Sequence, residues 1–555
     1  MNRLAKAITR ASLPALLLLV SSAAVAQTPV PTPGQEQIQT PPAPPLPDLT
    51  RLGVAGDNVL ALSMDDTIRR ALESNNDIEV ARGDVRVAEQ RLRALYGVYD
   101  PVFSVTPSFD QRVTPATSVF SGAGASGRVS TKTFNFNSAL SKYFETGGGA
   151  YELQFNNART TTSATNSTLS PYYSSALTLL YTQPLLRNRS IDASRHAIRV
   201  QKKVLSQTDA DFRRRTIEII SQAQGAYWNL VFALRNQQNQ LESLNVSRQN
   251  LKNVEAQIAA GTMAPLDRAQ VLTDIATREA NLLEATQGVT TAENSLKRLL
   301  LKDSAAPEWS AQITPTDTPA LDMSPVDLDG ALEEARQNRP ELSRLNLQKE
   351  INSIDVQYYR NQTRPEINLT GSVTSSGLAG DQVPCGAAAC PAVPSNYQGG
   401  YFQSLSNISD FKTREINVGV TISLPLRNRA AKANLATARV QKEQNEASYR
   451  SQEQTVAAEV RNAAQAVAIA QKRIVASRLA RESAEQQLAG EQKLYNVGRS
   501  TTFLLLQRQN ELTAARTNEL QAETDYSKAL ADLQRATAST LRANNVTVQS
   551  LVEQP

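Results

Sequence analysis

Side chains that could carry out chemistry are few in this chain. Its one histidine, His196, lies in a stretch of helical periodicity, with no cysteine and no cluster of carboxylates beside it. Nucleophilic catalysis needs a histidine placed between a nucleophile and an acid, and a zinc site needs several converging ligands. No glycine-rich phosphate loop follows a strand pattern. We therefore expect no enzyme activity, no cofactor and no metal, and we expect His196 to be a surface or packing residue.

The only cysteines, Cys385 and Cys390, stand close together in the sequence VPCGAAACP. In an exported chain such a pair favours a disulfide that closes a small loop, whereas a metal site would lack two more ligands. Residues 1–26 do predict export. They have a basic start, an apolar stretch and the cleavage pattern AVA at 24–26, as in a secretory signal peptide.

Composition narrows the remaining classes. The chain has 58 Lys and Arg against 53 Asp and Glu, a mild excess without a long basic run, so nucleic acid is not an expected partner. Beyond the signal peptide, no apolar run approaches the ~18 residues that a membrane helix needs. If the chain spans a membrane it must do so as a closed β-barrel, because lipid leaves no other way to satisfy the backbone polar groups.

The sequence is written twice. PLLRNRSIDASRHAIRVQK at 184–202 returns as LPLRNRAAKANLATARVQK at 424–442, with the two RNR motifs 240 residues apart. Upstream, Pro101 and Pro365 are 264 residues apart (365−101). The first unit therefore carries an insertion between its proline and its RNR motif. Regions that absorb insertions are usually loops or hairpin tips.

Each unit has the same predicted order of elements. A helix of about 36 residues, 62–97 in the first unit, precedes a β region, and a very long helix then runs from about 190 to 258. A glycine turn leads to a returning helix at 265–300. Apolar residues seven apart in the long helix predict a coiled-coil seam, and the two shorter helices placed end to end match the long one in length. We expect an elongated coiled coil with strands at one end and the turn at the other.

The β regions alternate apolar and small polar residues, as in INLTGSV at 367–373 and INVGVTISL at 416–424. This period of two predicts strands with lipid on one face and water on the other. Two strands per unit cannot close a barrel, and neither can four per chain. Several chains must pool their strands, which implies a homo-oligomer of cyclic symmetry.

The motifs DDTIRRALESN, YDPVFSVTPSF, TQPLLRNR and YNVGRST, in this order and with the duplication, resemble the TolC-type outer-membrane efflux channels. The resemblance covers about 60–540. It implies a mostly α fold with a β-barrel part, in which a homotrimer forms a long coiled-coil α-barrel across the periplasm and a transmembrane β-barrel in outer-membrane lipid. It also implies two partners, a periplasmic adaptor (membrane fusion) protein and an inner-membrane transporter.

The function implied by the resemblance is a passive exit duct for export, located in the cell outer membrane with a large periplasmic part. Two alternatives stay open: a dedicated type I protein-secretion duct, and a periplasmic coiled-coil scaffold without a pore. The sequence does not name the cargo. Neither does it decide whether two further strand-like runs in the first unit, 131–144 and 150–159, add a hairpin to the barrel wall or form an elaboration near it, although the family norm is two strands per unit.

The expected domains follow this order along the chain. They are a signal peptide at 1–26, a Pro-rich disordered linker at 27–59, the first repeat unit at 60–301, a linker at 302–325, the second repeat unit at 326–540 and a C-terminal tail at 541–555. The loop that holds the two cysteines is expected at the cell-exterior end of the barrel, because the chain runs outward from Pro365 and returns to Pro425.

The junctions between strands and helices are the first set of candidate site residues. Proline donates no N–H to a strand ladder and suits a helix start, so junctions are expected at Pro101, Pro184, Pro365 and Pro425. The nearby arginines are expected at the membrane–periplasm boundary, where they meet lipid headgroups: Arg187, Arg189, Arg427 and Arg429. In the alternative, Asn188 and Asn428 cap helices and the arginines are solvated.

The far end of the tunnel holds the second set. Gly261 and Gly498 end the long helices, where glycine accepts the left-handed conformation, and their turns are expected to dock the adaptor. The periplasmic gate is expected to comprise Asp267, Tyr495, Arg499, Phe503, Leu504 and Gln507. The family's gate aspartates correspond to Leu504 and Gln507 here, so we expect Phe503 and Leu504 to seal the mouth by dewetting. Asp267 would bond to Tyr495 or Arg499 across it. In the alternative, residues 503–506 only pack the helix pair.

Overall fold

The computed structural model describes residues 49–54, 58–319, 321, 324–384 and 392–548, all of which belong to the unit of the chain that runs from residue 47 on. Cys385 and Cys390, with the disulfide expected between them, lie outside the described residues. The helices are α1 (Met64–Ser74), α2 (Asn76–Tyr96), α3 (Ala193–Ala259), α4 (Pro265–Leu300), α5 (Leu328–Asn338), α6 (Pro340–Gln362), α7 (Tyr401–Ser409), α8 (Arg429–Asn496), α9 (Thr502–Thr537) and α10 (Thr540–Ala543). The strands are β1 (Val59–Leu62), β2 (Val102–Pro115), β3 (Arg128–Tyr143), β4 (Ala150–Thr162), β5 (Leu169–Pro184), β6 (Gln312–Pro315), β7 (Glu366–Gln382) and β8 (Arg414–Ser423).

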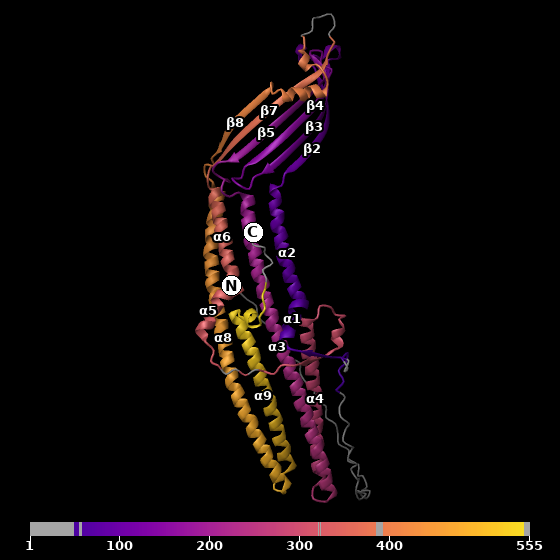
Figure 1. Ribbon diagram of the computed structural model, residues 1–555, viewed down its shortest axis with the longest axis vertical. Helices are drawn as coiled ribbons and strands as arrows, with labels where there is room; N and C mark the ends of the chain where they lie inside the picture. Colours follow the sequence, from indigo (N-terminus) through magenta and orange to yellow (C-terminus); the bar gives the residue numbers. More distant parts are fainter. Residues whose placement is uncertain (1–48, 55–57, 320, 322–323, 385–391, 549–555) are drawn as a thin grey trace, which may run out of the picture. The chain divides into compact units, whose positions relative to one another are not determined.

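The two long helices, α3 and α8, are each accompanied by three shorter helices, α1, α2 and α4 for α3 and α5, α6 and α9 for α8 (Figure 1). In the first unit α2 lies along the half of α3 next to the sheet, and α4 lies along the other half. The seam between them buries the residues seven apart that the sequence singled out, including Ile198, Leu205, Phe212 and Ile219. The predicted stacking of shorter helices end to end along one long helix is confirmed, and α4 has the predicted bounds.

The first helix of each unit is broken, which the sequence did not reveal. The side-chain oxygen of Asn75 accepts hydrogen bonds from the backbone N–H groups of Asp77 (2.9 Å) and Ile78 (3.3 Å), so Asn75 caps α2 just after α1 has ended. In the second unit Pro340 opens α6 directly after α5, because proline has no N–H with which to continue a helix. The prediction of one helix of about 36 residues is therefore wrong, since 11 residues are followed by a separate helix of 21 or 23.

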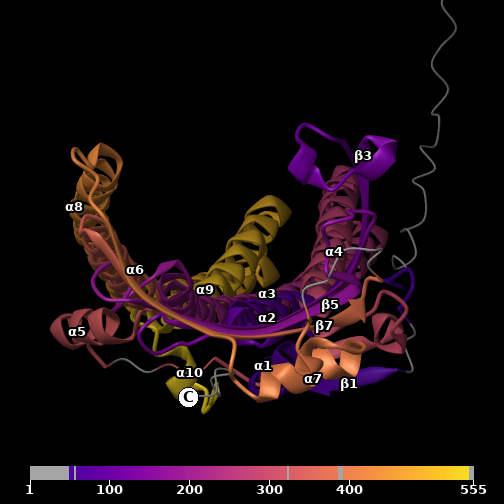
Figure 2. The ribbon, with the colours of Figure 1, turned by 90° about the horizontal axis from the view of Figure 1, so that it is seen from above.

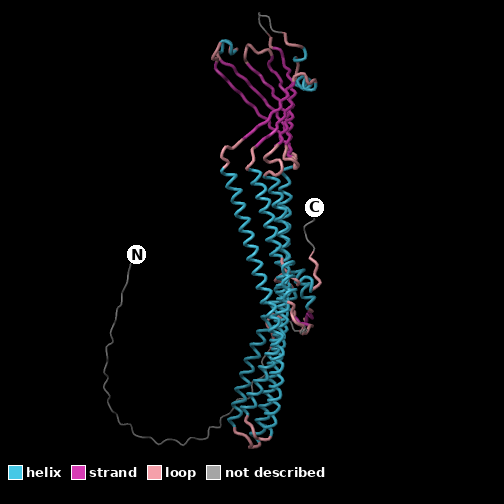
Figure 3. The backbone as a smooth tube through the Cα atoms, turned by 90° about the vertical axis from the view of Figure 1, so that its left-hand side faces the viewer, coloured by secondary structure: helices cyan, strands magenta, loops and turns pink. Residues whose placement is uncertain are grey.

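The strands form one antiparallel six-stranded sheet in the order β2-β3-β4-β5-β7-β8 (Figures 1 and 3). The β3–β4 hairpin comes from the insertion in the first unit and lies between β2 and β5. Every residue of β2 pairs with β3, from Val102 opposite Ser141 to Pro115 opposite Arg128. The two further strand-like runs are therefore part of the sheet and do not form a separate elaboration beside it.

The sheet and the helices curve in the same sense when seen along the helices (Figure 2). The short helix α7 lies on the convex side of the sheet, and α4 and α9 lie toward the concave side. The two sides are distinguished here because one face of the sheet carries apolar side chains and the other carries polar ones.

A small parallel sheet of β1 and β6 packs beside α3. Strand β6 belongs to the expected linker at 302–325, so part of this linker is ordered against the first unit. The hydroxyl of the fully buried Tyr227 of α3 fixes the contact, because it lies within hydrogen-bond distance of the carbonyl of Leu62 (3.1 Å) and of Oδ2 of Asp317 (2.7 Å). Among the described residues, no helix combines the length and the apolar character that crossing a membrane requires.

Candidate functional site

One face of the six-stranded sheet is apolar on every strand. A single row of directly opposed residues crosses the whole sheet: Phe103, Leu140, Leu153, Leu179, Val373 and Ile416. Phe103 is 68% exposed and Ile416 63% exposed in the single chain. An apolar patch of this extent needs lipid or protein to cover it. Apolar residues of β2 continue on this face from Phe103 to Val113, which corresponds to a band about 25 Å tall if the strands tilt by about 40°.

Aromatic and basic side chains border this apolar face at both ends. Near the helices Tyr151 lies opposite Tyr181, and its ring centroid is 5.5 Å from that of Phe144. At the other end Nε of Arg159 donates to the hydroxyl of Tyr173 at 3.4 Å. Amphipathic rings and long basic side chains are the residues that membrane proteins place at the two membrane–water interfaces. The apolar face therefore has the borders of a membrane-facing surface.

The opposite face of the sheet is polar. The adjacent row of opposed residues consists of Ser104, Ala139, Gln154, Thr178, Thr374 and Glu415. Neighbouring side chains bond to one another, as the hydroxyls of Thr178 and Thr374 do at 3.0 Å. Because α7 packs on the apolar face, through Ser404 against Ser175, the polar face is the concave one (Figure 2). This is the distribution expected of a wall with lipid outside and water inside.

The asparagines of the two RNR motifs make the turns between strands and helices. Asn188 has φ +65° and Asn428 φ +42°, in the left-handed region that asparagine tolerates better than most residues. The backbone N–H of Asn188 donates to Oδ1 of Asn361 (2.8 Å), and Nδ2 of Asn428 donates to the carbonyl of Thr363 (3.2 Å). Neither asparagine caps a helix with its side chain, because Asp192 caps α3 and no such bond is made at α8. The repeated motif thus supplies a turn and an anchor to the end of α6.

The structure places all four predicted prolines beside strand ends: Pro101 and Pro365 directly precede β2 and β7, Pro184 is the last residue of β5, and Pro425 follows β8. The four arginines differ from one another. Arg187 pairs with Glu366 at the start of β7, whereas Arg189, Arg427 and Arg429 are exposed. Contact of these arginines with lipid headgroups stays a prediction.

The two turns at the other end of the helices have the same geometry in both units. Gly261 and Gly498 each have φ +74°. The N–H of the following residue reaches back to a carbonyl five residues earlier, from Thr262 to Gln257 (3.0 Å) and from Arg499 to Leu494 (2.9 Å). Nothing lies within 4 Å of a Cβ added at either glycine. The glycines are thus needed for the backbone conformation alone, and the turn surface is open.

The predicted gate residues gather near these turns. Phe503 (59% exposed) and Leu504 are exposed, whereas Leu505 and Leu506 are buried, so the four apolar residues in a row face different sides. Phe503 lines a groove of about 610 Å³ between α4 and α9, together with Gln507. Within the described part of one chain, no hydrogen bond joins Asp267 to Tyr495 or Arg499. The gate stays a prediction.

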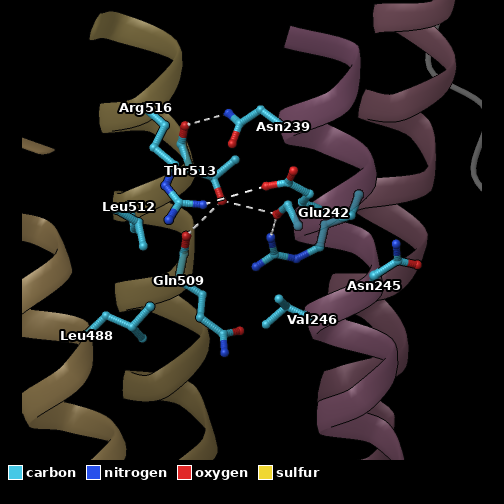
Figure 4. Close-up of a pocket in the computed structure, with 11 residues that line it drawn as sticks. Asn239, Glu242, Asn245, Val246, Leu488, Gln509, Leu512, Thr513 and Arg516 are labelled. Atoms are coloured by element: carbon cyan, nitrogen blue, oxygen red, sulfur yellow. Dashed lines mark hydrogen bonds and ion pairs between the residues drawn. The ribbon is translucent and has the colours of Figure 1, made fainter. Parts of the chain in front are cut away.

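A polar seam between α3, α4 and α9 was missed by the sequence analysis. Arg278 of α4 is 4% exposed, and its guanidinium donates to Oδ2 of Asp274 (2.6 Å) and to Oδ1 of Asn510 (2.7 Å). Beside it, Asn239 donates to the carbonyl of Thr513 at 3.2 Å. Arg278, Asn239 and Thr513 help to line a pocket of about 320 Å³, where Figure 4 shows side chains of α3 and α9 facing each other. A buried arginine on a coiled-coil helix has no sequence signal that separates it from a solvated one.

His196 packs between helices, as expected. Its Nε2 lies 2.7 Å from Oδ1 of Asp355, and its ring stacks on Tyr358 with centroids 4.4 Å apart. These contacts join α3 of the first unit to α6 of the second. In the part of the chain that the structure describes, no three His, Cys, Asp or Glu side chains converge as metal ligands would.

The fold of this chain is a curved sheet with one apolar and one polar face, joined to long paired helices that end in equivalent turns. Three solved structures share it. The outer-membrane channel OprN is 18% identical with a TM-score of 0.60, over 91% of this chain and 98% of OprN. The CmeC outer membrane channel of Campylobacter jejuni is 15% identical with a TM-score of 0.60, over 87% and 90%. CusC is 17% identical with a TM-score of 0.60, over 90% and 98%.

Sequence comparison agrees with the fold. Residues 331–539, which lie within the second unit, match the model of the family described as Outer membrane efflux protein. No curated protein sequence matches the chain. The resemblance to the TolC-type outer-membrane efflux proteins is therefore confirmed, by family sequence in the second unit and by fold over nearly the whole described chain.

Proposed function

We propose that the chain is one protomer of a homotrimeric exit duct in the outer membrane. Three sheets close a transmembrane β-barrel, and three sets of long helices form a coiled-coil α-barrel through the periplasm. The observation that carries the proposal is the sheet itself, which has an apolar convex face, a polar concave face and two open edges. A periplasmic scaffold without a pore would need none of these features.

The two open edges match each other. In the sheet order β2-β3-β4-β5-β7-β8 every neighbouring pair is antiparallel, so β8 of one chain and β2 of the next would also run antiparallel. Every residue of β2 is exposed in the single chain, and so are nearly all residues of β8. Long exposed edge strands associate with other strands, and closure into a barrel removes the edges. Three equivalent contacts of this kind close a ring.

The turns at the helical end are evidence for the proposed contact with a periplasmic adaptor. Gly261 and Gly498 form two exposed turns of equal geometry on each chain, so a trimer presents six. Such a ring of similar turns suits a periplasmic adaptor that contacts both units alike. The duct works passively, and an energised inner-membrane transporter supplies the cargo. Export of small molecules and type I protein secretion would both use this architecture.

The proposal is tested by fractionating cells that make the protein and running the membrane fraction on a denaturing gel before and after boiling. We expect the protein in the outer-membrane fraction, as an oligomer that resists detergent and collapses on heating to a band near the mass of one chain. A soluble periplasmic monomer would contradict the duct and favour the scaffold.

A further inference from the structure

We propose that the β3–β4 hairpin widens the membrane barrel to eighteen strands, so that the lumen in the outer membrane is broader than the two repeat units alone would make it. The inference rests on the trimer proposed above. The two units account for four strands per chain, or twelve in a trimer, whereas the large sheet has six strands per chain, or eighteen in a trimer.

Both faces of the hairpin have the residue types expected of a barrel wall, apolar on the convex side and polar on the concave side. Its convex face carries Phe134, Leu153 and Phe155, which continue the apolar residues of β2 on one side and β5 on the other. Its concave face carries Asn135 and Gln154, whose partners in register on β2 and β5, Ser108 and Thr178, are also polar. A hairpin that plugged the lumen or projected from the rim would not continue both faces of the sheet.

The hairpin is also anchored where the sheet meets the helices. Its turn has two glycines in the left-handed region, Gly147 (φ +77°) and Gly148 (φ +69°). A Cβ added at Gly148 would lie 2.6 Å from Nη2 of Arg195 and 2.7 Å from the carbonyl of Asn188, so only glycine fits against the start of α3. Nε2 of Gln183 donates to the carbonyl of Gly147 at 2.8 Å. The turn is thus fitted to the junction.

No long helix continues from the hairpin. Strand β3 follows β2 through a connection with two 3-10 helices of three residues each, and β4 leads to β5. The extra strands therefore enlarge the barrel without adding helices to the tunnel. With strands about 4.8 Å apart and tilted by about 40°, each occupies about 6 Å of perimeter. Eighteen strands then give a backbone diameter of about 36 Å, against about 24 Å for twelve. The helical tunnel, and not the barrel, would set the size limit for cargo.

The width can be measured between spin labels on the purified full-length trimer. Thr178 lies on the concave face of β5, a strand that a barrel of either size contains, so Thr178→Cys in a Cys385→Ser, Cys390→Ser background places three labels around the lumen. Three labels on an eighteen-stranded barrel are about 31 Å apart, and on a twelve-stranded barrel about 21 Å. A trimer with the shorter distance would contradict the proposal that the hairpin widens the barrel. A monomer with no intermolecular distance overturns the duct itself, so the two failures are distinguishable.

A second variant tests the hairpin directly. Deletion of residues 128–162 should let β2 pair with β5 and shorten the distance between labels at Thr178→Cys by about 10 Å. A label at Ala259→Cys, beside the distal turn, should keep its distance in the same variant. An unchanged distance at both positions in a folded deletion variant would contradict the proposal. If the deletion variant does not fold, the label at position 178 in the complete chain still decides.

Discussion

The backbone N–H of Asn188 donates to Oδ1 of Asn361 at 2.8 Å, and this bond ties the first unit of the repeat to the second at the level where sheet becomes helix. Nε2 of Gln362 returns a bond to Oδ1 of Asn188, also at 2.8 Å. Asn361 further donates to Ser190 at 3.2 Å. The end of α6 is therefore the anchor on which the strand-to-helix turn of the other unit is built.

Asn188→Ala should destabilise this junction. An alanine in the left-handed region costs about 1–2 kcal/mol, and the bond from Gln362 is lost as well. Asn188→Gly is the matched control, because it loses the same bond but accepts the backbone conformation. The temperature at which the oligomer dissociates on a gel should fall clearly for alanine and less for glycine. An equal fall in both would show that the side-chain bond, and not the turn, matters.

Charge on the two faces of β4 should have opposite consequences. Leu153 and Gln154 are neighbours on one strand, the first on the apolar face and the second on the polar face. Leu153→Arg should cost roughly 2–4 kcal/mol if the residue lies deep in the lipid, whereas Gln154→Arg should cost little. The measurement is the fraction of protein that folds into lipid vesicles. Similar yields for the two variants would mean that the apolar face does not contact lipid.

The gate prediction concerns the mouth at the helical end. Leu504→Ala or Asp267→Ala should raise the resting single-channel conductance, because each removes part of the proposed constriction. The open channel should be weakly cation-selective, since one acidic ring remains at the mouth. A control such as Leu266→Ala changes an exposed apolar residue beside Asp267. If neither gate variant changes the closed state, the gate lies elsewhere.

Arg278→Met should weaken the seam between α4 and α9. The substitution leaves Asp274, which is nearly buried, without its cationic partner, and breaking a buried pair from one side typically costs about 3–5 kcal/mol. The double variant Arg278→Met, Asp274→Leu removes both charges and should recover part of the loss. Unfolding in denaturant measures both. A double variant as unstable as the single one would argue against an unpaired charge as the cause.

Alkaline pH should weaken the contact between α3 and the small parallel sheet. Burial raises the pKa of Tyr227 to about 12, above its usual value of 10.0. Since the folded state keeps the proton longer than the unfolded one, the stabilisation is present below pH 10 and is lost as pH rises toward 12. The unfolding free energy of Tyr227→Phe should fall less steeply than that of the unchanged chain over this window. Parallel slopes would show that Tyr227 does not titrate there.

The helices were predictable because their signals are local and repeated. Ile198, Leu205 and Phe212 recur every seven residues, and this spacing alone predicts a helix with one buried side. Gly261 predicts the turn because its left-handed backbone conformation is one that few other residues adopt. The break at Asn75 was not predictable. Apolar spacing continues beyond it, and the break is held by a bond from Nδ2 of Asn75 to the distant carbonyl of Leu299 (3.1 Å).

The site was predictable only in part, because much of it depends on contacts between residues that are far apart in the sequence. Alternation in β3 and β4 reveals two strands but not their neighbours, since their place depends on pairing with β2 and β5. The left-handed turn at Asn188 and the burial of Arg278 likewise depend on residues far away in the sequence. The predicted role of the RNR motifs lay in their charged arginines, whereas in the structure the asparagine between them makes the turn.

The central claim, that β8 of one chain pairs with β2 of the next to close a shared barrel, can be tested by disulfide trapping between these two edge strands. The background is Cys385→Ser, Cys390→Ser, which should assemble normally because two cysteines only five positions apart would close a short loop. In it, Asn417→Cys on β8 is combined in turn with Ser104→Cys, Thr106→Cys or Ser108→Cys on β2. All four positions belong to the polar face. Oxidation should link three chains in at least one combination, as a trimer band that reductant removes, and variants with a single cysteine should stay unlinked. Membrane-inserted protein that remains monomeric in every combination would contradict a barrel shared among chains.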